Sequence, residues 1–331
     1  MKASLLLGPG QIAIDQVPDP NFGADEVMIQ CKCVGICGTD VSFFKGHRSV
    51  PYPFVLGHEI AGCVTAVGKN VTKISVGQRV IVEPNYPCGK CRLCLEGRGA
   101  VCPDKKSMGV NLPGCFSEYV VAPAEFVWPL PDAISYQDAA TMEPLAVSMH
   151  GLLQSRAQEG DTIAVLGCGV VGLLLVHAAV ASGVRVIAHD KFAGKLEMAR
   201  RLGAATESGN FDPAQLWRKK NVIKVFECAG TPETVELALD ASPRGAQIVL
   251  LGLSSEPACF RPIRLVREGI NISTSMIYDH PVDFARSIDW VAKGILHPGT
   301  IVTHTFSFDA IKEALELAGS GEAGKVHILV T

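Results

Sequence analysis

The chain has 331 residues, 48% of them hydrophobic, and a formal net charge of −3 at pH 7. A single hydrophobic core rarely grows beyond about 250–300 residues, so this length predicts two domains. The small net charge and the lack of a long lysine or arginine run argue against nucleic acid or an anionic membrane as the main partner. We therefore expect a small-molecule partner.

The N-terminal part, up to about residue 140, contains short β-type runs separated by Gly and Pro, which predicts a mainly β domain. The apolar run after Lys2 ends at Leu7, which is shorter than the roughly 7–15 residues of a signal-peptide core. We therefore expect a cytoplasmic protein with reduced thiols. Strands are expected at residues 27–33, 62–67, 79–82 and 117–121.

Four cysteines then follow with the spacing Cys88-x2-Cys91-x2-Cys94-x7-Cys102. Short spacers allow one turn to bring neighbouring thiolates to a single tetrahedral ion, and Gly89 relieves the crowded backbone. The alternatives are a disulfide pair or four unrelated buried thiols. In a reducing compartment such spacing more often indicates a metal, so it predicts a structural zinc site with these four ligands.

The segment 163–181 is apolar and long enough to cross a bilayer. Its surroundings favour a different structure, because residues 162–166 have the pattern of a buried strand, a glycine-rich turn follows, and residues 184–188 form a second strand-like run. Strand, turn, helix and strand together predict a βαβ unit and not a membrane span.

The turn itself, Gly167-Cys-Gly-Val-Val-Gly172, has the dinucleotide-binding spacing. Gly167 would permit the turn and Gly172 close helix packing, while Gly169, with Val170 and Val171 after it, would bring the helix N-terminus to a pyrophosphate. The alternative is an ordinary glycine turn.

Asp190 ends the next strand and could accept hydrogen bonds from the adenosine ribose hydroxyls. A carboxylate there would repel a 2′-phosphate, so NAD is expected rather than NADP, although the neighbouring Lys191 opposes this preference. A solvated aspartate is the alternative. The βαβ rhythm continues with strands at 222–227, 246–251 and 270–276 and a helix at 232–240, which predicts a doubly wound sheet.

Together these features resemble the zinc-dependent medium-chain dehydrogenase/reductase superfamily, with a similarity that runs from end to end. Within it, the chain looks most like the polyol, sugar-acid, aminocyclitol and threonine dehydrogenases, because Glu143 stands where the liver-type alcohol dehydrogenases have a cysteine. Besides the cysteine and glycine motifs, the matching segments are Gly35-Ile-Cys-Gly-Thr-Asp40, Tyr52-Pro-Phe-Val-Leu-Gly-His-Glu59, Glu143-Pro-Leu-Ala-Val147 and Ile301-Val-Thr-His-Thr-Phe306.

The resemblance implies an α/β protein in which a Rossmann domain is inserted into a GroES-like, mainly β catalytic domain. The catalytic domain would comprise residues 1–142, with the zinc lobe at about 84–104, and the chain would return to it at 281–331. The NAD-binding Rossmann domain would comprise residues 143–280. Relatives of this kind often form dimers or tetramers, so a homo-oligomer is expected.

The resemblance also implies a catalytic zinc, which with the structural ion makes two per chain. Cys37 and His58 would bind it, with Glu59 and Glu143 available to complete the shell, one directly and the other through water or by exchange. Asp40 would hold the ligand histidine in its tautomer. Zinc would acidify a bound hydroxyl, and NAD would accept the hydride.

Thr39 stands at the position of the family's proton relay, where its hydroxyl would pass the substrate proton towards the nicotinamide ribose. In many relatives a histidine three residues further on hands the proton to solvent, but this chain has Ser42 there, which leaves the exit route open. Lys195 matches a lysine that contacts the adenosine ribose, or it is a solvated helix lysine.

The expected activity is NAD-dependent oxidation of a secondary alcohol on a polyol, sugar acid or aminocyclitol. L-Threonine 3-dehydrogenase activity is the nearest alternative, and a non-catalytic protein that binds zinc and nucleotide is the other. Phe43, Phe44 and His47 follow the catalytic cysteine and could line the substrate cleft or serve as packing residues.

Overall fold

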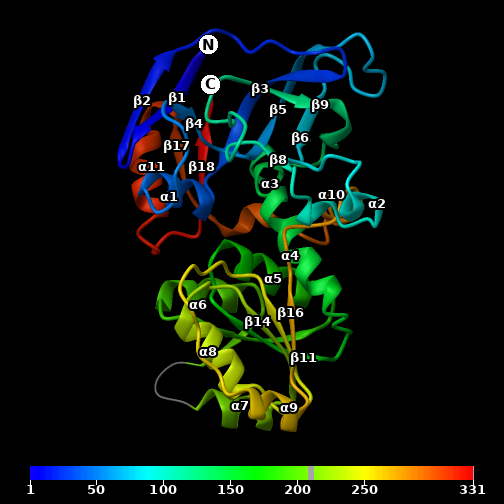
Figure 1. Ribbon diagram of the computed structural model, residues 1–331, viewed down its shortest axis with the longest axis vertical. Coiled ribbons are helices and arrows are strands. Elements are labelled where there is room, and N and C mark those ends of the chain that lie inside the picture. The colour runs from blue at the N-terminus through cyan, green and yellow to red at the C-terminus, as the bar shows by residue number, and fades with distance from the viewer. Residues whose placement is uncertain (208–211, 331) are drawn as a thin grey trace. The chain divides into compact units, whose positions relative to one another are not determined.

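The computed structural model describes residues 1–207 and 212–330. The chain divides into two compact units, of which the first joins Met1–Glu143 to Asp279–Thr331 and the second is Pro144–Tyr278. Two segments far apart in sequence therefore build one unit, as the blue-to-green and orange-to-red ribbons of Figure 1 illustrate.

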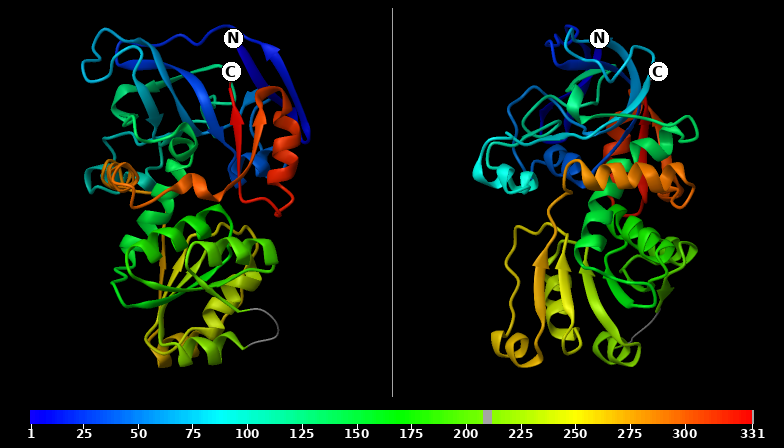
Figure 2. Two further views of the ribbon diagram at one scale, coloured as in Figure 1. Left: turned by 180° about the vertical axis from the view of Figure 1, so that it is seen from behind. Right: turned by 90° about the vertical axis from the view of Figure 1, so that its right-hand side faces the viewer.

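The main sheet of the first unit has the strand order β10-β6-β5-β3-β18-β17, with β9 also paired to β3. The C-terminal strand β18 lies against the N-terminal strand β3, so that red and blue strands meet in one sheet (Figure 2). The bounds are β3 (Glu26–Gly35), β5 (Glu59–Val67), β6 (Arg79–Val82), β9 (Tyr119–Pro123), β10 (Val127–Pro129), β17 (Val302–Ser307) and β18 (Lys325–Leu329).

The core of the first unit lies where this sheet packs against α1 (Gly38–Phe44) and α11 (Ile311–Ala318). Strand β3 alternates buried and half-buried residues, the period-two pattern of a strand with one covered face. Phe43 and Phe44 are buried members of this core, so of the two roles considered for them packing is the observed one, whereas His47 is exposed.

The smaller elements of the first unit lie around this core. They include the sheet β2-β1-β4, the pair β7-β8 and the α-helices α2, α3 and α10. Their bounds are β1 (Lys2–Gly8), β2 (Gln11–Gln16), β4 (Phe54–Val55), β7 (Asn85–Tyr86), β8 (Lys106–Ser107), α2 (Arg92–Leu95), α3 (Tyr136–Ala140) and α10 (Val282–Ala292).

The second unit contains a parallel sheet with the order β13-β12-β11-β14-β15-β16. Counted from the first strand of the unit, this is the order three, two, one, four, five, six of a doubly wound dinucleotide-binding fold. The strands are β11 (Thr162–Leu166), β12 (Arg185–His189), β13 (Ala205–Thr206), β14 (Val222–Glu227), β15 (Gln247–Leu250) and β16 (Asn271–Thr274).

Helices alternate with these strands, and buried Trp217 lies in the core that they share with the sheet. The chain passes from the first unit to the second within α4, between Glu143 and Pro144. The helices are α4 (Met142–Gln154), α5 (Val170–Ala181), α6 (Ala193–Arg201), α7 (Pro213–Lys219), α8 (Pro232–Ala241) and α9 (Pro262–Glu268). Of the helices in the described ranges, none is long and apolar enough to span a membrane.

The expected fold class is confirmed, and the predicted strands at 79–82, 162–166 and 222–227 have their predicted bounds. The other strands differ from their predicted bounds, and β3 and β5 extend beyond them. The Ser117 hydroxyl donates to the carbonyl of Tyr119, where β9 begins, and the N–H of Ile270 donates to Leu265 in α9, so β16 starts one residue later than predicted.

A buried carboxylate connects the two segments of the first unit, Met1–Glu143 and Asp279–Thr331. Glu83, fully buried, has its Oε2 2.8 Å from His280 Nδ1 and accepts a hydrogen bond from the indole of Trp128. Burial would lower the pKa of His280, but Glu83 and the more distant Glu125 raise it above its ordinary value. The imidazolium of His280 therefore stabilises the folded state.

We predict that this contact makes stability depend on pH. A histidine with a raised folded-state pKa contributes its full stabilisation below the unfolded pKa and loses it as pH rises through the folded pKa. His280→Gln should therefore reduce the free energy of unfolding more at about pH 6 than at about pH 9. Urea titrations of wild type and variant measure this. His297→Gln, at an exposed histidine, is the control, and an equal cost of His280→Gln at both pH values would refute the prediction.

Candidate metal centres and nucleotide site

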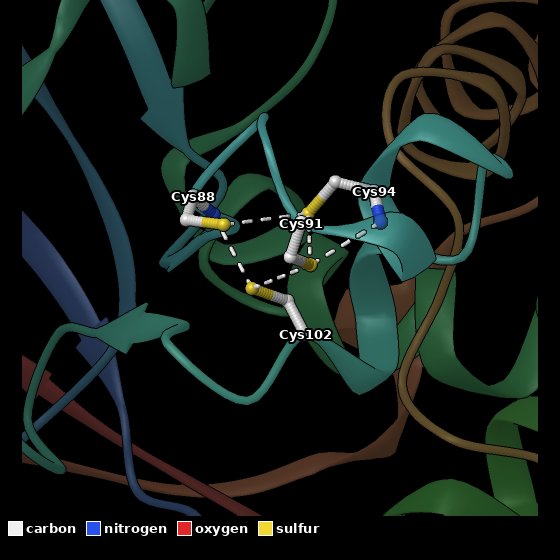
Figure 3. A group of neighbouring side chains, drawn as sticks. All are labelled: Cys88, Cys91, Cys94 and Cys102. Atoms are coloured by element: carbon white, nitrogen blue, oxygen red, sulfur yellow. Dashed lines mark hydrogen bonds between the residues drawn. The ribbon is translucent and has the colours of Figure 1, made fainter.

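The four cysteines predicted to bind the structural zinc converge in the first unit (Figure 3). The sulfur of Cys91 lies 3.4 Å from that of Cys94 and 3.8 Å from that of Cys102, and Cys88 and Cys94 are 3.9 Å apart. Tetrahedral zinc with bonds of about 2.3 Å places its sulfurs about 3.8 Å apart. The four side chains therefore fit a closed zinc site.

The chemistry of these thiols also favours a cation. All twelve cysteines of the chain are free, which excludes the disulfide alternative in this structure. Backbone N–H groups of Lys90 and Cys91 lower the pKa of Cys88 to about 7, whereas desolvation and the neighbouring thiols raise that of Cys94 to about 12. The Cys88 thiol therefore ionises readily, whereas ionisation of the Cys94 thiol beside it is unfavourable. A bound cation would stabilise both thiolates.

A second group of metal-ligand side chains lies in the same unit. Cys37, His58 and Glu59 present one ligand atom each, all within 4.8 Å of one another. Cys37 is the N-cap of α1, His58 directly precedes β5 and Glu59 is its first residue. Sulfur, nitrogen and oxygen ligands in such proximity are a donor set that suits zinc.

Asp40 connects the cysteine and the histidine. It is fully buried, and its carboxylate accepts hydrogen bonds from the backbone N–H groups of Cys37 at 2.9 Å and Gly57 at 3.1 Å. One of its oxygens also lies 3.6 Å from Nδ1 of His58. Burial would lower the pKa of His58, yet Asp40 and Cys37 raise it well above its ordinary value, so the surroundings favour a positive charge.

Two other residues predicted for this site have different surroundings. Glu143 is buried in the first turn of α4. Among the described residues, its carboxylate does not belong to the Cys37, His58 and Glu59 group, whose ligand atoms lie within 4.8 Å of one another. Thr39 lies partly exposed in the first turn of α1, and its backbone N–H donates to Sγ of Cys37 at 3.5 Å. Ser42 is partly buried one turn further on.

The sequence reasoning missed Lys325. This lysine begins β18, is fully buried and forms an ion pair with Glu59, while its ammonium also donates to the carbonyl of Ile36 at 2.8 Å. A signal was available, because Lys325 shares the last strand with the apolar residues Val326, Ile328 and Leu329. A lysine at such a place requires a buried partner.

In the second unit, the glycine-rich turn fits a phosphate. Gly167 has φ +90°, which only glycine adopts easily, and a side chain on Gly172 would collide with the carbonyl of Gly167. Beside Gly169 a Cβ would meet open space. Gly169 also caps α5 without a side-chain hydrogen bond, and Val170 and Val171 are half-buried. The N-terminal N–H groups of this helix suit an anion.

Asp190 secures this turn. One carboxylate oxygen accepts a hydrogen bond from the N–H of Cys168 at 2.7 Å, and the other from the N–H of Phe192 at 2.8 Å. Because an ionised carboxylate offers about four acceptor positions, capacity for ribose hydroxyls remains. The ammonium groups of Lys191 and Lys195 lie 5.2 and 5.3 Å from the centroid of the Phe192 ring.

Comparisons with known proteins agree with both units. Residues 23–132 match the family profile described as alcohol dehydrogenase GroES-like domain, and residues 170–293 match that of zinc-binding dehydrogenase. The second profile covers most of the segment that holds the glycine-rich turn and the parallel sheet.

Individual proteins are similar over almost the whole chain. Sorbitol dehydrogenase of Bacillus subtilis is 33% identical across 96% of this chain and 93% of its own, and L-threonine 3-dehydrogenase of the same organism is 31% identical across 96% and 94%. A crystal structure of an Escherichia coli alcohol dehydrogenase complexed with NADH is 32% identical, covers 100% of this chain and 99% of its own, and has a TM-score of 0.92. The chain belongs to the zinc-dependent medium-chain alcohol dehydrogenase superfamily, in its polyol and threonine dehydrogenase-like branch.

Proposed function

We propose that this protein is an NAD-dependent dehydrogenase that oxidises a secondary alcohol of a polyol, sugar acid or aminocyclitol and holds two zinc ions per chain. The observation that carries the proposal is the approach of Cys37, His58 and Glu59 within 4.8 Å. A binding module would need no such open donor set in addition to a closed four-thiolate lobe.

In this proposal Cys37 and His58 are the constant zinc ligands, and Glu59 and Glu143 are the carboxylates available to complete the shell. A zinc ion held by these residues would supply a Lewis acid that lowers the pKa of a substrate hydroxyl, and NAD would be the hydride acceptor. Asp40, whose carboxylate lies 3.6 Å from Nδ1 of His58, would hold the ring in the orientation and tautomer that a metal ligand needs. The Thr39 hydroxyl would accept the substrate proton while it passes its own proton on towards the nicotinamide ribose.

In the second unit, the first turn of α5 would bind the pyrophosphate of NAD. Asp190 would accept hydrogen bonds from the adenosine ribose hydroxyls, and Lys195 would contact the same ribose. The similar crystal structure holds NADH, which supports the assignment of NAD. A 2′-phosphate would face the negative charge of Asp190, although Lys191 and Lys195 lie on the adjoining turn.

The substrate class is tested by NADH absorbance with a panel of polyols, sugar acids, aminocyclitols and L-threonine. A relative that is 31% identical is an L-threonine 3-dehydrogenase, so L-threonine is the competing candidate. Turnover confined to L-threonine would replace the polyol assignment. No turnover of any alcohol by protein with full metal content would favour a non-catalytic protein that binds zinc and nucleotide.

Our first prediction for this site concerns metal content. Purified protein should contain two zinc ions per chain, because two separate donor sets fit the ion. Cys37→Ser should remove about one of them with little effect on stability, whereas Cys91→Ser should lower thermal stability strongly, since binding at a closed site is part of the folding free energy. Elemental analysis with thermal unfolding measures both. A content of about one zinc, unchanged by Cys37→Ser, would exclude the catalytic zinc.

A further prediction concerns cofactor choice. The kcat/KM for NAD should exceed that for NADP by at least about tenfold, or about 1.4 kcal/mol of discrimination. Asp190→Ala should reduce this ratio because it removes the charge that repels the 2′-phosphate. The variant also loses two backbone hydrogen bonds, so the ratio, in which general losses cancel, is the quantity to measure. Equal use of both cofactors by wild type would show that the role assigned to Asp190 is wrong.

The proton relay gives the last prediction for this site. Thr39→Ala should lower turnover by roughly 10²–10⁴, the usual contribution of a positioned proton-transfer group. Zinc content and NAD affinity should stay close to wild type, because the Thr39 backbone N–H that faces Cys37 is kept. Thr39→Ser should retain most activity, and Ser42→Ala should cost far less, since water can replace an exit group. Wild-type turnover in Thr39→Ala, with hydride transfer rate-limiting, would mean that the proton leaves by another route.

A further inference from the structure

A buried carboxylate lies at the carboxyl edge of the parallel sheet in the second unit. Glu227 is the last residue of β14 and is 0% exposed. Its Oε1 accepts hydrogen bonds from the backbone N–H groups of Ala229 and Gly230, at 2.8 and 2.9 Å, and from the hydroxyl of Thr234 at 2.8 Å. An ionised carboxylate accepts hydrogen bonds and cannot donate them. These three donors therefore match the charged form of Glu227.

The charge of Glu227 has no cation beside it. Among the residues that the structure describes, no lysine, arginine or histidine forms an ion pair with this carboxylate, and its buried Oε2 has no hydrogen-bond partner. Fully buried glutamates are almost always paired. Desolvation, and after it the charge of Glu227, raises the pKa of the adjacent Cys228 thiol well above its ordinary value. The carboxylate charge therefore acts on its neighbours without a compensating charge.

The loops around Glu227 lie beside the glycine-rich turn. A Cβ on Gly167 would lie 2.7 Å from the backbone nitrogen of Ala229, so the loop after β14 packs directly on that turn. The N–H of Gly252, which follows β15, donates to the carbonyl of Glu227, and a Cβ on Gly252 would lie 2.5 Å from Oε2. Two loops thus enclose the carboxylate next to the turn that fits a pyrophosphate.

The strand order indicates which half of a dinucleotide this edge would receive. In a doubly wound sheet a dinucleotide binds across the crevice where the strand order reverses, with one mononucleotide on each half. The reversal lies between β11 and β14. Because Asp190, the proposed adenosine ribose partner, follows β12, the nicotinamide half comprises β14, β15 and β16. Glu227 ends the strand of this half that is nearest to the reversal.

We propose that Glu227 determines the redox preference of the cofactor site, because its buried charge favours binding of NAD over NADH. The nicotinamide ring of NAD carries a positive charge that NADH lacks, so a negative charge at this edge stabilises the oxidised cofactor selectively. This preference would ease the release of NADH after an alcohol has been oxidised. The inference rests on the proposed NAD-binding function.

Glu227→Gln tests the inference, because it removes the charge and keeps a side chain of the same length with an oxygen for the two backbone N–H groups. The ratio of Kd for NAD to Kd for NADH should rise about tenfold, which is the effect of one unit charge on another across about 12 Å at an effective dielectric constant of about 20. Calorimetric titration of the metal-loaded, full-length protein without alcohol measures both constants. An unchanged ratio would overturn the inference.

Two further variants separate the charge from the structure of the loops. Glu227→Asp keeps the charge on a shorter side chain, so it should weaken binding of both cofactors and leave the ratio close to wild type. A rise as large as in Glu227→Gln would mean that loop geometry sets the ratio, and would overturn the inference. Asp240→Asn, at an exposed residue of α8, removes an equal charge from the surface and should change neither constant.

The outcomes also separate this inference from the function on which it rests. If wild type binds neither NAD nor NADH, the NAD-binding function and the inference both fail. If it binds both and the ratio does not respond to Glu227→Gln, only the inference fails.

A variant at Thr234 decides the matter should Glu227→Gln not fold. The Thr234 hydroxyl lies 2.8 Å from Oε1 of Glu227, so the ammonium of Thr234→Lys would neutralise the carboxylate charge while Glu227 stays in place. The ratio of the two dissociation constants should then rise as well. A ratio equal to that of wild type in folded Thr234→Lys would overturn the inference.

Discussion

The antiparallel register of β3 and β5 is the constraint on which the candidate catalytic site depends. It places Gly35 opposite Glu59 at one end of the ladder. The chain leaves β3 at Gly35 and reaches Cys37 two residues later, and His58 directly precedes Glu59, the first residue of β5. Since a slip of one residue would turn every side chain to the opposite face of the sheet, this register fixes which groups meet.

Features encoded by short-range spacing could be predicted from the sequence. The four cysteines of the lobe lie within fifteen consecutive positions, from 88 to 102, and their sulfurs meet in the structure. The strand–turn–helix around Gly167 was equally local, and β11 has its predicted bounds. In both cases the chain between the residues is too short to permit many other arrangements.

Features created by long-range pairing could not be predicted in this way. Lys325 and Glu59 are far apart in sequence and meet only because β18 joins the sheet beside β3. Only the family resemblance pointed to such a return, and it said nothing of the lysine. Asp190 was predicted to bind a ligand, whereas the hydrogen bonds it accepts within the protein became visible only with the turn geometry.

The central claim is that the first unit, residues 1–143 and 279–331, holds two zinc ions of different character, one enclosed by four thiolates and one bound at Cys37 and His58. Anomalous diffraction at the zinc absorption edge from crystals of the purified protein tests it most directly. The account predicts one peak among the four cysteines and a second within about 2.3 Å of Cys37 Sγ and a His58 nitrogen. A single peak, or a second zinc away from Cys37 and His58, would contradict it.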